Sequence, residues 1–540
     1  MSSTLIRGTF ILTLGVFISK FLGLFFVIPF YALLGNEVEP TSLYSYGYVP
    51  YTIFLTIATA GVPLAVSKFI SKYNSLQEYS VGRKLFKSGL VLMTLTGIVS
   101  FLIMYIFAPF FAKITIPSDE QVITVEQVTT VIRAVSFALI IIPFMSLIRG
   151  FFQGHNSMGP TAVSQVIEQI VRIVFLLVGV YVVLYVIKGD MTTAISVATF
   201  GAFVGGIASL ASLIWYWFKR KPHFDKLLEE DKGTVDISLV EIYKEIIAYS
   251  IPFIFVGIAN PLFQLVDQVT FNRAMGAIGN ADVADTAFGV LNFAAHKLVI
   301  IPVSLATAFS MSLLPLITSA YTQNEYGKMN RQLDQTFQIL LFLTIPAAFG
   351  ISLLAEPTYT LFYSHSDLGT EVLRTYAPVA ILFALFAVTA AILQGIDKQK
   401  FTILSLLVGL LIKLLLNIPL IKLLETQGAV LATTLGYLAA TVINLIVIKV
   451  YGNYQYNTVF RRTLLILMFN VVMGVAVIIL YGILAQFLDP SAKMQAILLV
   501  AICGLAGAGV YFYLSFRSRL ADRLFGERAA KVRRKLKLGQ

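Results

Sequence analysis

Basic residues interrupt several apolar runs of this sequence. Lys20 lies inside GVFISKFLGLFFVIPFYALLG (residues 15–35), and Lys297, Arg172 and Lys413 lie inside three other long apolar runs. A lysine or arginine at the centre of a bilayer costs about 2.5–3.5 kcal/mol on insertion scales. Because a lysine stem reaches only about 6 Å, snorkelling does not relieve that cost at mid-membrane. Lys20 and Lys297 therefore indicate a water-filled cavity that suits an anionic group such as a phosphate or pyrophosphate.

Two of these cations have polar neighbours at helical spacing. Glu168 precedes Arg172 by four residues, so a self-neutralised pair and a ligand site are both open interpretations. Lys413 precedes Asn417 by the same interval, and Thr433 follows in the next apolar run. These three residues predict a small polar cluster inside the membrane.

Asp267 and His296 complete the set of candidate site residues. Asp267 is an embedded carboxylate, open to interpretation as the counter-charge of Lys297, a proton or cation site, or a helix–helix hydrogen bond. His296 precedes Lys297 directly and is a candidate cavity residue or a plain polar wall. The four histidines lack metal-ligand spacing and the chain has no GxxxxGK[ST] motif, so we expect no metal, no cofactor and no ATPase engine.

The elements that must position these residues are transmembrane helices. Of 540 residues, 58% are hydrophobic and 13% charged, with a mean hydropathy of +0.84, which is typical of a polytopic membrane protein. The apolar runs are continuous and too long for the strands of a barrel, so the predicted fold is all-α. Fourteen spans are predicted, near residues 9–34, 46–70, 86–112, 127–152, 161–187, 192–218, 247–272, 286–318, 336–355, 373–394, 401–422, 428–450, 462–486 and 494–516.

The distribution of basic residues predicts the orientation. With the N-terminus inside, 29 lysines and arginines fall in cytoplasmic stretches and only six in outer loops. The positive-inside rule then favours an even number of spans in the cell membrane, with both termini cytoplasmic. The basic tail from Arg517 suits anionic membrane lipids better than nucleic acid.

A weak duplication divides the chain. Gln153 and Gly154 precede Arg172 by the same intervals at which Gln394 and Gly395 precede Lys413, at an offset of 241 residues. This spacing predicts two parallel six-helix repeats, as in transporters that rock one half against the other. The predicted parts are an N-lobe (1–218), a cytoplasmic linker (219–246), a C-lobe (247–450), two further helices (451–516) and a basic tail (517–540).

The fourteen helices, the duplication, Lys20 in SKFLGLFF and Lys297 in AAHKLVIIPVSLATAFSMSLLPLI together resemble the multidrug/oligosaccharidyl-lipid/polysaccharide exporter superfamily, and within it the MurJ-type lipid II flippases of Gram-positive bacteria. The resemblance implies a V-shaped cavity between two lobes that alternates its access and carries lipid II, the undecaprenyl-pyrophosphate-linked peptidoglycan precursor, to the outer leaflet. It implies a lipid-tail groove at residues 451–516. Lys20 and Lys297 match two basic cavity positions of that family.

The same resemblance bears on energy and partners. Lys413, Asn417 and Thr433 fall where some relatives bind sodium, and an ammonium group there argues against sodium coupling and for the membrane potential as driver. Lipid II or a related glycolipid, membrane lipids and the cell-wall synthesis machinery are the implied partners, with no nucleic acid.

Other functions compete with this interpretation. One is export of another lipid-linked polysaccharide or a spore-wall precursor by the same mechanism. Another is multidrug cation antiport by the same fold, which would use Asp267 and Glu168. A more distant one is a membrane-embedded polyprenyl-lipid transferase, which would need a clustered acidic or histidine site that the sequence does not show.

Overall fold

Helices account for the ordered architecture of this chain. The computed structural model describes residues 14–15, 17–59, 61–117, 121–234, 238–311 and 314–535, and no strand occurs within these ranges. Eleven helices in the described residues are long and apolar enough to cross a membrane, and Phe17–Leu33 is a shorter apolar helix. The all-α prediction is thus confirmed, while the count of fourteen spans stays a prediction.

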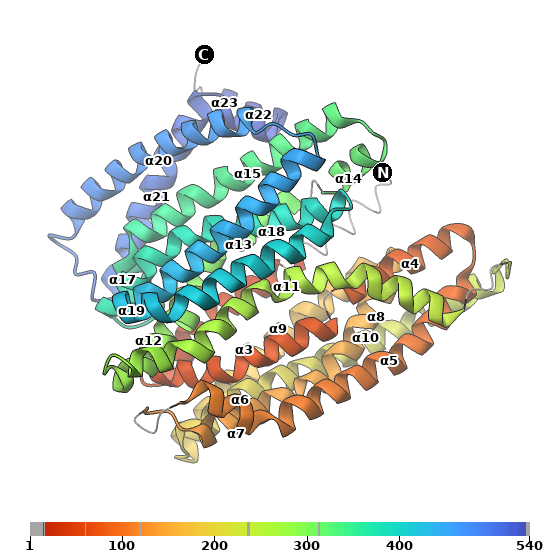
Figure 1. Ribbon diagram of the computed structural model, residues 1–540, viewed down its shortest axis with the longest axis horizontal. Coiled ribbons are helices and arrows are strands. Elements are labelled where there is room, and N and C mark those ends of the chain that lie inside the picture. Colours follow the sequence, from red (N-terminus) through yellow and green to blue (C-terminus); the bar gives the residue numbers. More distant parts are fainter. Residues whose placement is uncertain are drawn as a thin grey trace. The chain divides into compact units, whose positions relative to one another are not determined.

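The chain forms two compact units, Met1–Asp285 (unit 1) and Thr286–Gln540 (unit 2). Within unit 1, α5, α8 and α10 run side by side, and α3 packs against α7 and α11 (Figure 1). The helices of unit 1 are α2 (Val27–Leu33), α3 (Glu39–Thr59), α4 (Val62–Leu76), α5 (Tyr79–Ile106), α6 (Ala108–Thr115), α7 (Val125–Ser136), α8 (Ala138–Gly154), α9 (Met158–Tyr181) with the π-helix η1 (Val182–Val186), α10 (Met191–Glu229) and α11 (Leu239–Gly276).

Helix α12 (Ala281–Gly289) carries the chain from unit 1 into unit 2. Within unit 2, α15 lies beside both α13 and α20, and α20 packs on α21 (Figure 1). The remaining helices are η2 (Val290–Ala295), α13 (His296–Met311), α14 (Leu314–Thr322), α15 (Tyr326–Leu353), α16 (Ala355–Phe362), α17 (Asp367–Tyr376), η3 (Ala377–Val379), α18 (Ala380–Gly395), α19 (Gln399–Tyr451), α20 (Asn457–Leu484), α21 (Lys493–Arg517), α22 (Leu520–Phe525) and α23 (Glu527–Lys535).

Breaks in the helical backbone at two places set the limits of three predicted spans. The run 46–70 is broken near Gly61, whose φ of +78° is a conformation that glycine adopts at little cost, so α3 ends and α4 begins there. The runs 401–422 and 428–450 are the two halves of α19, separated by a break at Glu425 (φ 51°, ψ −130°). In both cases a local backbone conformation, rather than hydropathy, sets the boundary.

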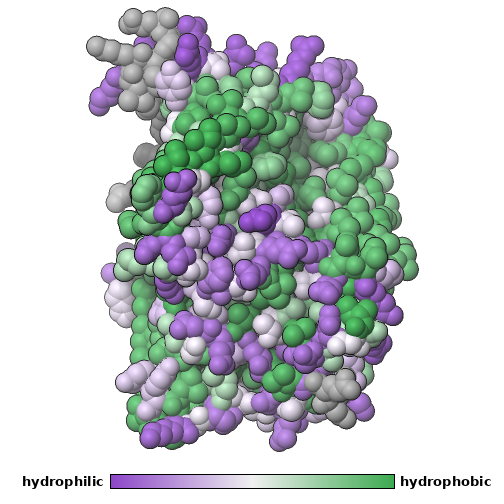
Figure 2. Space-filling model, turned by 90° about the vertical axis from the view of Figure 1, so that its left-hand side faces the viewer, coloured by the Kyte–Doolittle hydropathy of each residue, from purple (hydrophilic) through white to green (hydrophobic). Residues whose placement is uncertain are grey.

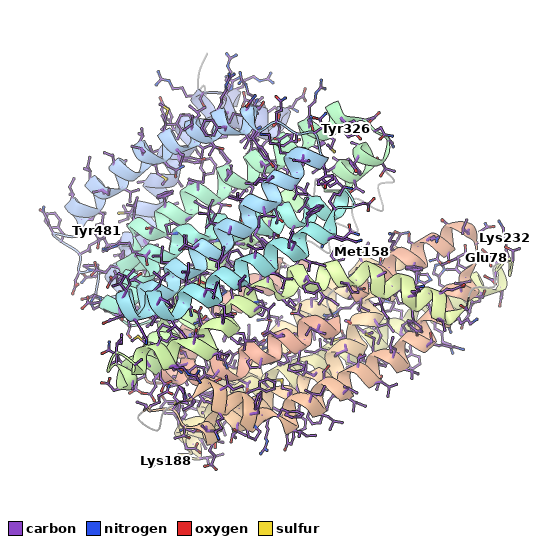
Figure 3. All side chains as sticks on the ribbon, in the orientation of Figure 1. Glu78, Met158, Lys188, Lys232, Tyr326 and Tyr481 are labelled. Atoms are coloured by element: carbon purple, nitrogen blue, oxygen red, sulfur yellow. The ribbon has the colours of Figure 1, made fainter. Side chains whose placement is uncertain are left out.

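The predicted linker is mostly helical. Helix α10 continues to Glu229, beyond the expected end at 218, because Phe224 is buried against the rings of Phe151 and Trp217. After α10 the chain bonds to the turn between α4 and α5: the Glu78 carboxylate accepts from Thr234 N at 3.0 Å. Figure 3 shows Glu78 and Lys232 together at one end of unit 1 and Lys188 at the opposite end.

Large apolar side chains remain exposed along several helices. Figure 2 shows hydrophobic residues spread over broad areas of one face, and the exposed side chains include Leu95 on α5, Leu411 on α19 and Val475 on α20. Patches of this extent would drive aggregation in water but are the normal surface of a helix in lipid. The chain is a multi-pass membrane protein.

A buried polar network joins the helices at one end of unit 1. The Asp285 side chain is fully buried and accepts hydrogen bonds from the Tyr46 hydroxyl (2.7 Å), Gln121 Nε2 (3.2 Å) and Ile123 N (3.0 Å). Ser42 Oγ donates to the Asp285 carbonyl at 2.5 Å. One carboxylate therefore connects α3, the segment before α7 and α12.

Helix α11 enters the same network. Asn272 Nδ2 donates to the Tyr46 hydroxyl at 2.8 Å and to Thr115 O at 3.0 Å, and Gln268 Nε2 donates to Tyr46 O at 3.0 Å. These bonds explain why packing groups α11 with unit 1, whereas the spacing of the duplication assigns residues 247–450 to a second lobe. Packing and duplication are different properties, and the predicted lobe boundaries stay a prediction.

Replacing Asp285 by Ala should destabilise unit 1. The substitution leaves three buried donors without their acceptor, at a cost of about 1–3 kcal/mol for each group that stays unsatisfied. Thermal unfolding of the purified protein in detergent measures the effect. Asp282→Ala is the matched control, because Asp282 is an exposed acid on the same helix. Equal unfolding temperatures for the two variants would contradict the role of this network.

Candidate functional site

The helical segment that carries Lys20 packs along α9. A Cβ at Gly15 would lie 2.8 Å from the Ala162 Cβ, and one at Gly23 would lie 3.0 Å from Gln169 Nε2. Further along, the Tyr185 hydroxyl donates to Leu33 O at 3.0 Å. The segment thus runs parallel to α9, and small residues permit the close approach. This register places Lys20, whose side chain is exposed, opposite about residue 166 of α9.

Arg172 projects from α9 to α3. Its Nη2 donates to the Tyr44 hydroxyl at 3.1 Å and to the Tyr48 hydroxyl at 2.7 Å. The guanidinium also lies 5.2 Å from the centre of the Tyr48 ring, within the range of a cation–π interaction. Tyr44 and Tyr48 are themselves stacked at 5.1 Å. Two neutral phenols therefore hold this arginine.

Glu168 pairs with Arg149 rather than with Arg172. Arg149 Nη2 lies 2.7 Å from Glu168 Oε2, and the two side chains are only 12% and 23% exposed. Arg149 also donates to Ser164 Oγ at 2.9 Å and to Ser209 Oγ at 2.8 Å. The self-neutralised Glu168–Arg172 pair, one of the two interpretations that the four-residue spacing left open, is thus not formed. Arg149 on α8 reaches the carboxylate first.

In unit 2, Lys297 and His296 begin α13 immediately after the π-helix η2. Such bulges are frequent at functional sites. Lys297 is half-buried, with Nζ 3.8 Å from the centre of the Phe293 ring. His296 is buried, and its Nδ1 lies 2.9 Å from the Tyr376 hydroxyl. The histidine is thus fixed in the helix packing of unit 2 beside the lysine.

The predicted cluster at Lys413 is assembled between the two halves of α19. Lys413 Nζ donates to Thr433 Oγ1 at 2.6 Å and to Ala429 O at 3.2 Å, and Lys413 is fully buried. Asn417 is fully buried one turn further along. A Cβ at Gly409 would lie 2.7 Å from Gly436 O, so this glycine lets the halves approach. The geometry brings the three residues into one region, and their role in ion coupling stays a prediction.

Asp267 is buried on α11 in unit 1. Its interpretation as the counter-charge of Lys297 involves a residue of unit 2 and stays a prediction. No group of three or more His, Cys, Asp or Glu side chains that could hold a metal ion occurs in the described residues.

Comparison with known proteins identifies the family to which this chain belongs. The family model described as polysaccharide biosynthesis protein matches residues 5–321, and the MatE model matches residues 252–419. The chain is 46% identical over 534 residues to the lipid II flippase MurJ of Bacillus subtilis (strain 168), covering 98% of each protein. This chain belongs to the MurJ family.

Other relatives also match along most of the chain. The uncharacterised membrane protein YabM of Bacillus subtilis is 26% identical, over 95% of this chain and 92% of that protein. Among solved structures, a lipid II flippase MurJ in an inward closed conformation aligns with a TM-score of 0.65 at 16% identity, covering 93% of this chain and 97% of the other. An inward-facing multidrug MATE transporter aligns with a TM-score of 0.61 at 13% identity, covering 83% and 95%. These structural matches show the shared fold.

Three residues that contact the candidate site residues are not predicted from the sequence. Arg149 counts there only as a cytoplasmic charge, and Tyr44 and Tyr48 are not among the candidates. A usable signal existed, because Tyr44, Tyr48 and Tyr51 recur at helical spacing in an apolar run, and a tyrosine hydroxyl inside a membrane needs a polar partner.

The Arg149–Glu168 pair makes a stability prediction. Glu168→Ala should destabilise the protein by about 3 kcal/mol, since it leaves a largely buried cation without its counter-charge. The double variant Arg149→Met/Glu168→Leu should recover most of that loss, because both charges are then gone. Thermal unfolding in detergent measures both. If Glu168→Ala unfolds like the parent protein, the pair is not structural and Glu168 returns as a ligand-site residue.

Proposed function

We propose that this protein translocates lipid II from the inner to the outer leaflet of the bacterial cell membrane. The observation that carries the proposal is the 46% identity to a lipid II flippase along 98% of both chains. Such a match covers nearly the whole of both chains, so it supports a shared cargo as well as a shared fold. The chain is then a transporter, and we expect it to act without a cofactor.

The charges of the site support an anionic cargo. Unit 1 presents Lys20 and Arg172, and unit 2 presents Lys297 beside η2. Ammonium and guanidinium groups bind phosphate oxygens through charge-assisted hydrogen bonds. We therefore assign Lys20 and Lys297 to the pyrophosphate of lipid II.

The alternative of multidrug cation antiport is weaker. It needs free carboxylates in the cavity, and Glu168 is neutralised by Arg149 at 2.7 Å. Asp267 would remain as the cation site. The MATE-like fold supports shared architecture and no particular cargo, because the structural matches are below 25% identical.

The proposed mechanism is alternating access by two lobes. In unit 1 the end that carries Lys188 lies opposite the end that carries Glu78 and Lys232 (Figure 3), which supports an outer loop at 188 and a cytoplasmic linker at 219–246. The break at Gly61 lies within one predicted span, and the break at Glu425 lies between two of them. Both breaks are therefore compatible with fourteen spans and two cytoplasmic termini. Residues 451–516 would hold the lipid tail, and the cell-wall synthesis machinery would be the partner on the pathway.

The membrane potential is the proposed energy source. Returning a cationic cavity across the field is worth about 2.3 kcal/mol per charge per 100 mV. Sodium coupling is not needed if the Lys413 ammonium permanently fills the polar cluster at Thr433 and Ala429 O, to which it donates at 2.6 and 3.2 Å.

Depletion of this protein tests the proposed cargo. In cells with no other lipid II flippase, depletion should abolish cleavage of lipid II by an enzyme added outside the cell. Wild type should restore cleavage, whereas Lys20→Ala and Lys297→Ala should restore little, because each removes a cation from the anion site. Lys188→Ala is the matched control, since Lys188 is an exposed lysine in a loop.

Unchanged cleavage after depletion would remove lipid II as the cargo. Full restoration of cleavage by both alanine variants would leave lipid II as the cargo. It would contradict the assignment of Lys20 and Lys297 to the pyrophosphate.

A further inference from the structure

We propose that Arg172 contacts the cargo, that Tyr44 and Tyr48 are the residues that position it, and that Arg172 and Lys20 form a two-point site for the diphosphate within unit 1. This inference rests on the proposed function and adds to it a third cation, delivered from α9, and the two phenols that aim it.

The hydrogen bonds of Arg172 leave three of its N–H donors available. A guanidinium has five N–H donors. Both printed bonds, to Tyr44 and Tyr48, start from Nη2. Nε and Nη1 make no hydrogen bond to the described residues, and they are not among the sealed, unsatisfied polar atoms of this part of the chain. The three N–H groups that remain, one on Nε and two on Nη1, can each donate a charge-assisted hydrogen bond to a phosphate oxygen.

Nothing neutralises Arg172 within the described residues. The nearest carboxylate along α9, Glu168, is occupied by Arg149 at 2.7 Å. Phenol hydroxyls fix the direction of the guanidinium without cancelling its charge, which a carboxylate would do. The arginine thus keeps its full charge for a ligand.

The stem of Arg172 is also confined. A Cβ at Gly205 on α10 would lie 2.9 Å from the Arg172 Cβ, so α10 closes the space behind the side chain. Because α10 packs against its stem and the α3 tyrosines bind its guanidinium, the Arg172 side chain has few accessible conformations. Pre-positioning of this kind lowers the entropy that binding costs.

Lys20 lies close enough to act on the same ligand. The register of the Lys20 segment puts Lys20 opposite about residue 166 of α9. At 1.5 Å per residue, that position is about 9 Å from Arg172 along the axis of α9. Arg172 is held in place, but the exposed Lys20 side chain extends about 6 Å, and a bound diphosphate can bridge the distance that remains. A diphosphate offers a separate phosphate group to each cation, whereas a single small anion would engage only one of them fully.

A double-mutant cycle on the purified full-length protein tests this inference. Binding of lipid II is measured in detergent, with undecaprenol as the uncharged probe. Arg172→Lys should weaken lipid II binding about tenfold, because the Nε and Nη1 donors and their fixed direction are lost while the charge remains. Tyr48→Phe should weaken it several-fold, and the double variant should be no weaker than Arg172→Lys alone, because Tyr48 acts through Arg172.

Tyr51→Phe is the matched control. Tyr51 is a buried tyrosine three residues further along α3 that makes no hydrogen bond to Arg172, and its variant should bind like wild type. Undecaprenol binding and the unfolding temperature should stay the same in all variants. If Arg172→Lys does not fold, the comparison of Tyr48→Phe with Tyr51→Phe still decides the question.

The outcomes separate this inference from the proposed function. If wild type binds lipid II no better than undecaprenol, the proposed function fails. If wild type prefers lipid II and Arg172→Lys binds it equally well, the contact role of Arg172 fails, and if Tyr48→Phe binds it equally well, the positioning role of Tyr48 fails. If both variants weaken binding and their effects add fully, Tyr48 is an independent contact and its positioning role is overturned.

Discussion

A cation that is packed among apolar helices must be stabilised by water, by a counter-charge or by hydrogen-bond acceptors, and these partners fix which helices meet around it. Arg149 forms an ion pair with a carboxylate and donates hydrogen bonds to two serines. Arg172 donates to two phenol hydroxyls and lies over the face of one ring. Lys413 donates to a hydroxyl and a carbonyl. Each solution ties together helices that lipid would otherwise separate, because apolar helices gain little from one another in hydrocarbon.

These contacts depend on small residues at the crossings. Gly205 brings α10 against the stem of Arg172, and Gly23 brings the Lys20 segment against Gln169. Gly409 does the same for the two halves of α19 beside Lys413. In each case a Cβ would lie about 3 Å or less from the opposing helix, closer than ordinary van der Waals contact. Close backbone approach is therefore the condition under which short polar side chains can reach across an interface.

Much of the fold and part of the site could be predicted from the sequence. Hydropathy located most helices, and the four-residue and inter-helix spacings anticipated that Lys413 and Thr433 meet. The partner of Glu168 could not be predicted, because spacing along one helix favoured Arg172 while the tertiary fold supplies Arg149 from α8. The same limit hid Asp285, whose four hydrogen-bonding partners lie more than 150 residues away in sequence. The break at Gly61 depends on a left-handed backbone that hydropathy does not encode.

The spacing that suggests the duplication pairs Arg172 with Lys413, and the structure gives the two cations opposite surroundings. Lys413 is fully buried, and its ammonium donates to groups within α19 itself. Arg172 is half-buried and directs only one nitrogen to its tyrosines. An ammonium that is enclosed by its own helix hairpin holds that hairpin together, whereas a guanidinium with three N–H donors still available can form new bonds. If the two positions descend from one ancestral residue, a single embedded charge has become a packing element in one half and remains available to a ligand in the other.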